Sequence, residues 1–128
     1  MSAESKPSTV PKRYTIAVDF DGVLHSYTSE WSGAEHCPDP PVEGAIDWLN
    51  TISSKFDVVI HTTRGDQPGG NEAVVAWLRQ HGYVGPEPLV TSRKVPALIY
   101  IDDRAWRFEG TFPTANEIHR ARPWNKEV

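Results

Sequence analysis

Hydrophobic positions along the chain follow two periods. Short apolar runs rich in β-branched residues predict strands at residues 14–18, 56–61, 88–91 and 97–101. Between them, apolar residues recur at helical spacing, first at Ala45, Trp48, Leu49 and Ile52 and again at Val74, Trp77, Leu78 and His81, with Gly82 as a stop. Strands that alternate with helices in this order predict an α/β fold with a parallel sheet.

The remaining segments carry weaker patterns. Residues 1–12 are expected to be a disordered lead, and residues 13–128 a single domain. Residues 25–42 show no helical period and are expected to form a loop that closes at three prolines. After Trp106 the pattern weakens, and a further edge strand is expected at residues 112–115. The chain shows no internal repeat.

Composition narrows the function classes. The 128 residues suit one domain, and a net charge of -4 argues against stable nucleic-acid binding. Cys37 is the only cysteine, which excludes an intramolecular disulfide. No apolar stretch reaches transmembrane length, and residues 1–13 lack the apolar core of a signal peptide. We therefore expect a cytoplasmic protein with no membrane partner.

Polar side chains follow three of the predicted strands. They are Asp19 and Asp21 after the first strand, Thr62 after the second, and Asp102 and Asp103 after the fourth. The carboxyl ends of parallel strands share one edge of the sheet, which is where open α/β sheets bind ligands. Four carboxylates and a hydroxyl are thus expected to meet there, with Lys94 just before the fourth strand.

This set of groups suits phosphoryl transfer. Clustered carboxylates favour a hard cation, and Mg²⁺ is bound by a few carboxylates together with water and substrate phosphate. Mg²⁺ and a lysine can neutralise a phosphoryl group that an aspartate then attacks, giving an aspartyl-phosphate. Each signal also has a plainer interpretation by itself: Asp19 and Asp21 as a solvated turn, Thr62 as a β-favouring residue, and Lys94 as a surface charge with Arg93 as its rival.

Taken together, these motifs resemble those of the haloacid dehalogenase superfamily. Asp19-Phe-Asp21-Gly-Val, Thr62, Lys94 and Asp102-Asp103 stand in that family's order, over about residues 14–113. The resemblance implies a three-layer, Rossmann-like core with a parallel sheet, and roles for individual residues. Asp19 would be the nucleophile, Asp21 the general acid and base, Thr62 a hydrogen bond to the phosphoryl group, and Lys94 the cation that orients Asp19. Asp19, Asp102, Asp103 and the main-chain carbonyl of Asp21 would hold Mg²⁺.

The family's branches differ at two further features. Phosphatases and phosphomutases of the family carry an aspartate at the place of Asp21, so the resemblance favours a phosphatase over a dehalogenase. The intervals at residues 25–57 and 65–93 leave no room for a cap domain. An open site suits an extended phosphate, so a nucleotide or polynucleotide phosphatase is the alternative enzyme. A non-catalytic binding module on the same scaffold is the alternative outside enzymes.

Residues near the motifs are candidates for substrate binding. Gly22, Thr63 and Arg64 are expected to contact the substrate, with Arg64 on its phosphate. Tyr27 and Trp31 either anchor the loop at residues 25–42 or offer a stacking surface to a base, and anchoring is favoured. His25 is expected to have no catalytic role, and the basic positions after residue 118 are expected to be solvated.

Overall fold

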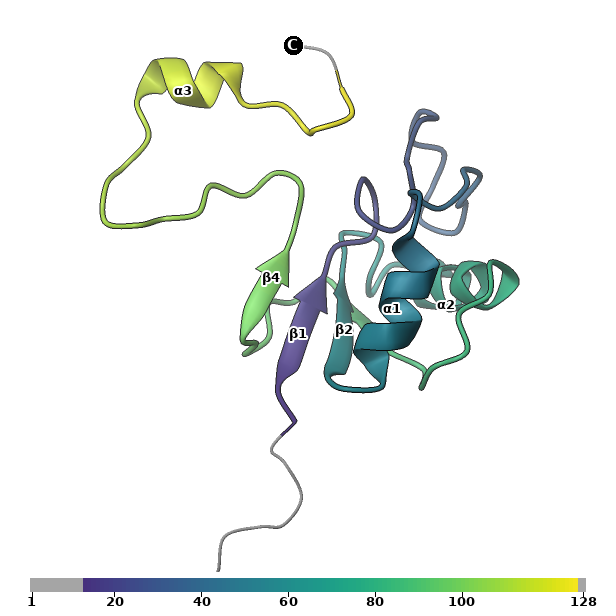
Figure 1. Cartoon of the computed structure of the whole chain (residues 1–128). Helices are drawn as coiled ribbons and strands as arrows, with labels where there is room; N and C mark the ends of the chain where they lie inside the picture. Colours follow the sequence, from purple (N-terminus) through teal and green to yellow (C-terminus); the bar gives the residue numbers. More distant parts are fainter. Residues whose placement is uncertain (1–12, 127–128) are drawn as a thin grey trace, which may run out of the picture.

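The computed structural model describes residues 13–126, so the expected disordered lead at residues 1–12 lies outside the described part. Seven elements follow the chain (Figure 1). They are β1 (Thr15–Val18), α1 (Ala45–Ser53), β2 (Asp57–His61), α2 (Gly70–Gln80), β3 (Leu89–Thr91), β4 (Ile99–Ile101) and α3 (Ala115–Arg120). Both helices and all four strands predicted from periodicity are present, with ends that differ by a few residues.

The four strands form one parallel sheet in the order β3-β2-β1-β4. The predicted α/β fold with a parallel sheet is confirmed. Val18 at the end of β1 pairs with Ile60 on one side and Ile101 on the other. The residues that follow β1, β2 and β4 therefore emerge along one edge of the sheet.

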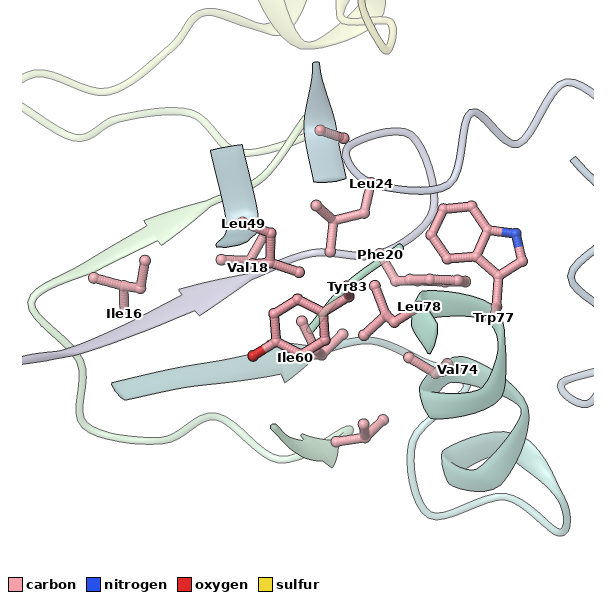
Figure 2. Close-up of a cluster of buried hydrophobic side chains, with 12 residues drawn as sticks. Ile16, Val18, Phe20, Leu24, Leu49, Ile60, Val74, Trp77, Leu78 and Tyr83 are labelled. Atoms are coloured by element: carbon pink, nitrogen blue, oxygen red, sulfur yellow. The ribbon is translucent and has the colours of Figure 1, made fainter. Parts of the chain in front are cut away.

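The main hydrophobic core lies between one face of this sheet and the helices α1 and α2. Side chains alternate across a strand, so Ile16 and Val18 share a face, and Ile60 lies beside Val18 on that face. These residues form one buried cluster with Leu49 from α1 and Leu78 from α2 (Figure 2). Both helices thus cover the same face.

The opposite face is crossed by the connection between β3 and β4. The Tyr100 hydroxyl donates to the carbonyl of Val95 and accepts from its N–H at 2.6 Å. The ammonium of Lys94 lies 5.5 Å from the centre of the Tyr100 ring. Within residues 13–126, this connection contains no helix. The described fold is therefore a parallel sheet with α1 and α2 on one face.

The expected edge strand at residues 112–115 is wrong, because this stretch leads into α3. The Thr114 hydroxyl accepts a hydrogen bond from the Glu117 N–H at 3.1 Å, and the Glu117 carboxylate accepts from the Thr114 N–H at 2.8 Å. This reciprocal capping box satisfies N–H groups at the helix start and favours a helix there. α3 buries none of its residues and stands away from the sheet (Figure 1).

The loop at residues 25–42 is confirmed, and it contains no helix. It is held to the end of β1 by short pairings of His25 with Asp21 and with Pro41. Among the described helices, none combines the length and apolar character needed to cross a membrane.

Candidate active site

Three carboxylates meet where β1 and β4 end. Asp19 follows β1, and its N–H donates to the carbonyl of Ile101 at 2.9 Å, which aligns the two strand ends. One side-chain oxygen from each of Asp19, Asp102 and Asp103 lies within 4.8 Å of the other two. The convergence expected from the parallel sheet is therefore present for these three residues.

No described side chain forms an ion pair with this carboxylate cluster. Burial and then the negative charge of Asp102 raise the pKa of Asp19 to about 8, against a hydrogen bond from the Phe20 N–H that lowers it. Within residues 13–126, none of the three carboxylates forms an ion pair. The cluster is therefore suited to take up positive charge from outside the protein.

Asp103 supplies a second sign of a cation site. Its Oδ1 atom is buried and has no hydrogen-bond partner in the described part of the chain. Gly22, at φ 86°, lies so close that a Cβ there would stand 2.2 Å from the Asp103 Oδ2. A buried acceptor without a donor is costly. Carboxylate oxygens are the ligands that Mg²⁺ prefers, so the residues present fit this cation.

Asp21 is oriented by two neighbours rather than by the carboxylate cluster. Arg64 donates its Nε–H to Oδ2 at 2.9 Å and to Oδ1 at 3.2 Å, and Nδ1 of His25 lies 2.9 Å from Oδ1. The Nε2 atom of His25 accepts from the Asp39 N–H at 3.0 Å, so the ring proton sits on Nδ1 and is donated to Asp21. Burial by itself would raise the pKa of Asp21, but the hydrogen bonds from His25 and Arg64 lower it below its ordinary value.

Arg64 lies elsewhere than expected. Its side chain is 1% exposed and does not line the cavity beside the carboxylates, so the expected contact with substrate phosphate is not available to it. A buried guanidinium needs acceptors for its donors. Arg64 finds them in Asp21 and in three main-chain carbonyls of the 25–42 loop, which Nη1 contacts. These are Gly33 at 3.1 Å, Ala34 at 3.0 Å and His36 at 2.7 Å.

A cavity of about 370 Å³ opens beside the carboxylates. The expected site residues that line it are Asp19, Asp21, Gly22, Thr62, Thr63, Asp102 and Asp103. Tyr27 and Trp31 form part of its wall, and Trp31 stacks at 4.7 Å over the Arg64 guanidinium. Lys94 is not among the lining residues, and the described residues form no ion pair between Lys94 and Asp19.

The cavity also has a wall that sequence reasoning missed, made by residues 123–126. Pro123, Asn125 and Lys126 line the cavity, although Lys126 was expected to be solvated. Three hydrogen bonds attach the segment to the chain that follows β1. They run from Trp124 Nε1 to the Gly22 carbonyl at 2.6 Å, from Asn125 Nδ2 to the Ser26 carbonyl at 2.9 Å, and from Lys126 Nζ to the Tyr27 carbonyl at 3.0 Å.

Sequence reasoning also underrated His25. The signal available was its position four residues after Asp21, within reach of that carboxylate. No comparable signal exists for residues 123–126, because about a hundred residues separate them from the carbonyls they contact. Only the folded chain brings them together.

No protein-family model matches the chain, and comparisons with curated proteins and with solved structures likewise find no match. The chemistry therefore rests on the site itself. Asp19, Asp102 and Asp103 form a carboxylate cluster with no ion-pair partner among the described residues, and Arg64 holds the carboxylate of Asp21, two residues after Asp19. Both the cluster and Asp21 line the same cavity.

Proposed function

We propose that this protein is a Mg²⁺-dependent phosphatase, a phosphoric monoester hydrolase of the haloacid dehalogenase type without a cap domain. The observation that carries the proposal is the convergence of Asp19, Asp102 and Asp103 at the rim of a cavity, with a buried Asp103 oxygen for which residues 13–126 offer no donor. The cytoplasmic location and the three-layer core implied by the resemblance remain part of this proposal, although residues 13–126 place helices on only one face of the sheet.

The metal would be held by the side chains of Asp19, Asp102 and Asp103 and by the main-chain carbonyl of Asp21. When bound, Mg²⁺ supplies positive charge that offsets the repulsion between the carboxylates and a phosphoryl group. The raised pKa of Asp19 shows how strongly its surroundings disfavour its ionised, nucleophilic form when no cation is present.

The residues of the chain perform two chemical steps. The Asp19 carboxylate attacks phosphorus, the bond from phosphorus to the leaving-group oxygen breaks, and Asp21 gives that oxygen its proton. Asp21 then takes a proton from a water molecule, which attacks the phosphorus of the aspartyl-phosphate, releases inorganic phosphate and restores Asp19. Thr62, which lines the cavity, would donate a hydrogen bond to the phosphoryl group.

The proton on Asp21 needs a source, because Arg64 and His25 favour its ionised form. That form is the one required in the second step, where Asp21 activates water. For the first step, the negative charge of an incoming phosphoryl group raises the proton affinity of a nearby carboxylate. Substrate binding itself would therefore prepare Asp21 as the acid.

A nucleotide phosphatase is the second candidate, and one observation favours it. Tyr27 and Trp31 line the same cavity as the carboxylates, so a base on a bound nucleotide would find aromatic surface there. The net charge of -4 argues against a long polynucleotide as the substrate.

The test is a screen of phosphate esters with Mg²⁺, with excess EDTA, and with Asp19→Asn as the inactive control. We expect release of inorganic phosphate only with the metal and only in the wild type, together with an acid-stable phosphorylated enzyme that the variant does not form. Undiminished turnover in EDTA would contradict the proposed requirement for Mg²⁺. A fully active Asp19→Asn enzyme would remove the covalent mechanism, and a wild type that binds phosphate esters without hydrolysing them would favour the non-catalytic binding module.

A further inference from the structure

The segment Pro123–Lys126, called here the closing segment, forms a wall of the cavity that no motif of the sequence includes. After α3 the chain returns toward the loops at the carboxyl end of β1 (Figure 1). Its three anchoring hydrogen bonds all end on main-chain carbonyls of residues 22–27, at the end of the nucleophile motif and directly after it. The closing segment is thus held by the stretch of chain that contains His25, the residue that donates to Asp21.

Lys126 brings positive charge to a cavity that four aspartates line. Of the residues that line the cavity, only Arg104 and Lys126 are cationic. The Lys126 ammonium is located by the Tyr27 carbonyl at 3.0 Å and lies 5.5 Å from the centre of the Tyr27 ring. An ammonium has three donors, so two remain for a ligand. A lysine in this position suits a phosphate as a point charge.

Asn125 presents an acceptor that nothing in the described chain uses. Its amide nitrogen donates to the Ser26 carbonyl, and its Oδ1 is buried without a hydrogen-bond partner. The hydroxyl of Ser26, at the same junction, is also buried without a partner among the described residues. Buried unpaired polar atoms are costly. Because Asn125 also lines the cavity, a small turn of its side chain would bring this unpaired acceptor to a donor on a bound molecule.

We propose that the closing segment is the substrate-recognition element of this site. Lys126 binds the phosphoryl anion, and Oδ1 of Asn125 accepts a hydrogen bond from the leaving group. The proposal rests on the phosphatase function proposed above and narrows its substrates to phosphate monoesters whose leaving group carries hydroxyl or N–H donors, the chemistry of a sugar phosphate or a nucleotide.

The kinetic test compares ribose 5-phosphate, whose sugar carries hydroxyl donors, with phenyl phosphate, whose leaving group has none, both with saturating Mg²⁺. For Lys126→Gln we expect KM to rise about 10-fold for both esters while kcat changes little, and Lys126→Arg to recover most of the loss. For Asn125→Ala we expect kcat/KM to fall about 10-fold for ribose 5-phosphate and clearly less for phenyl phosphate. The matched control is Lys55→Gln, an exposed lysine just before β2, at the opposite end of the sheet.

Two kinetic results would overturn the proposal. One is a Lys126→Gln enzyme whose KM values equal those of Lys55→Gln. The other is an Asn125→Ala enzyme that loses the same factor on both esters. Circular dichroism and thermal unfolding of each variant show whether a loss of activity comes from a loss of fold.

A binding measurement separates this proposal from the phosphatase function. Calorimetric titration of the Mg²⁺-loaded protein with inorganic phosphate should give a Kd about 10-fold weaker for Lys126→Gln than for wild type, and no change for Lys55→Gln. A wild type that binds phosphate through Lys126 yet hydrolyses no ester would remove the phosphatase and keep the phosphate-binding role. If the enzyme is active but Lys126→Gln leaves the Kd for phosphate unchanged, the phosphatase function stands and the role of the closing segment in recognition is refuted.

Discussion

The buried guanidinium of Arg64 donates its Nε–H to both carboxylate oxygens of Asp21, at 2.9 and 3.2 Å. The same side chain donates to three carbonyls of the 25–42 loop. One residue therefore connects the orientation of the proposed general acid to the position of the loop that walls the cavity. This makes Arg64 a positioning residue, in place of the substrate-binding role expected from its sequence position.

Arg64→Met should destabilise the protein by about 3–5 kcal/mol, because it leaves the Asp21 carboxylate with His25 as its remaining donor and removes the donor of three loop carbonyls. The measurement is urea unfolding at pH 7. Arg120→Met on the exposed surface of α3 is the matched control, with an expected change within about 0.5 kcal/mol. Equal stabilities of the two variants would contradict the tie between Arg64 and the loop.

Asp21→Asn should slow hydrolysis in a way that depends on the leaving group. General acid and base catalysis contributes about 10²–10⁴-fold, and an amide supplies neither role. An alkyl phosphate needs protonation of its leaving oxygen, whereas the p-nitrophenolate of p-nitrophenyl phosphate is a weak base that leaves readily without a proton. We therefore expect the rate of aspartyl-phosphate formation to fall far more for the alkyl ester than for the aryl ester. Rapid-quench kinetics measure this rate. The same factor for both esters would argue against Asp21 as the acid.

Asp103→Asn should have opposite effects on stability without and with Mg²⁺. Without the metal, the substitution removes a charge from a crowded carboxylate cluster and should raise the melting temperature. With Mg²⁺ at 100 times its Kd, the wild type should gain about 2.7 kcal/mol, which the variant should largely lose. Thermal unfolding in EDTA and in a Mg²⁺ series measures both. The control is Glu87→Gln, at an exposed position remote from the cluster. A wild type whose melting temperature does not change with Mg²⁺ would refute the metal site.

Asp39 gives a pH-dependent contribution to stability. Burial by itself would raise its pKa, but hydrogen bonds from the hydroxyl and N–H of Ser29 lower it below the ordinary value of 3.8. A carboxyl whose pKa is lowered by folding stabilises the native state above 3.8 and loses that contribution as the pH falls through 3.8 toward the native-state pKa.

Asp39→Asn should therefore cost about 1–3 kcal/mol at pH 7, and the difference from wild type should shrink below pH 3.8. Urea unfolding at a series of pH values measures the difference, with the exposed Glu30→Gln as control. A gap between wild type and Asp39→Asn that stays constant down to pH 2.5 would contradict the assignment.

The part of Lys94 remains a prediction from the resemblance. If Lys94 serves the phosphoryl group, Lys94→Ala should lower kcat/KM by about 10-fold or more, whereas Arg93→Ala should leave it nearly unchanged. In the structure the Lys94 ammonium lies over the Tyr100 ring, so reaching Asp19 requires a different side-chain conformation. Steady-state kinetics of the two variants decide between the residues. If Lys94→Ala leaves kcat/KM unchanged while Lys126→Gln lowers it strongly, the cation that serves the phosphoryl group is Lys126.

The sequence by itself determined the parallel α/β sheet and the meeting of Asp19 with Asp102 and Asp103. Both follow from local periodicity and from the rule that parallel strands end at one edge, so neither needs knowledge of side-chain packing. The edge strand expected at residues 112–115 failed because the capping box of Thr114 and Glu117 outweighed a weak apolar pattern.

Only the tertiary structure decided the burial of Arg64, the proton position on His25 and the return of residues 123–126 to the cavity. Each depends on a partner outside the local pattern, from 14 residues away for the Asp39 N–H that binds His25 to 102 residues away for the Gly22 carbonyl that accepts from Trp124. A sequence pattern reports which face of an element is apolar. It does not report which distant carbonyl a donor reaches, because that depends on how the loops pack once the sheet has formed.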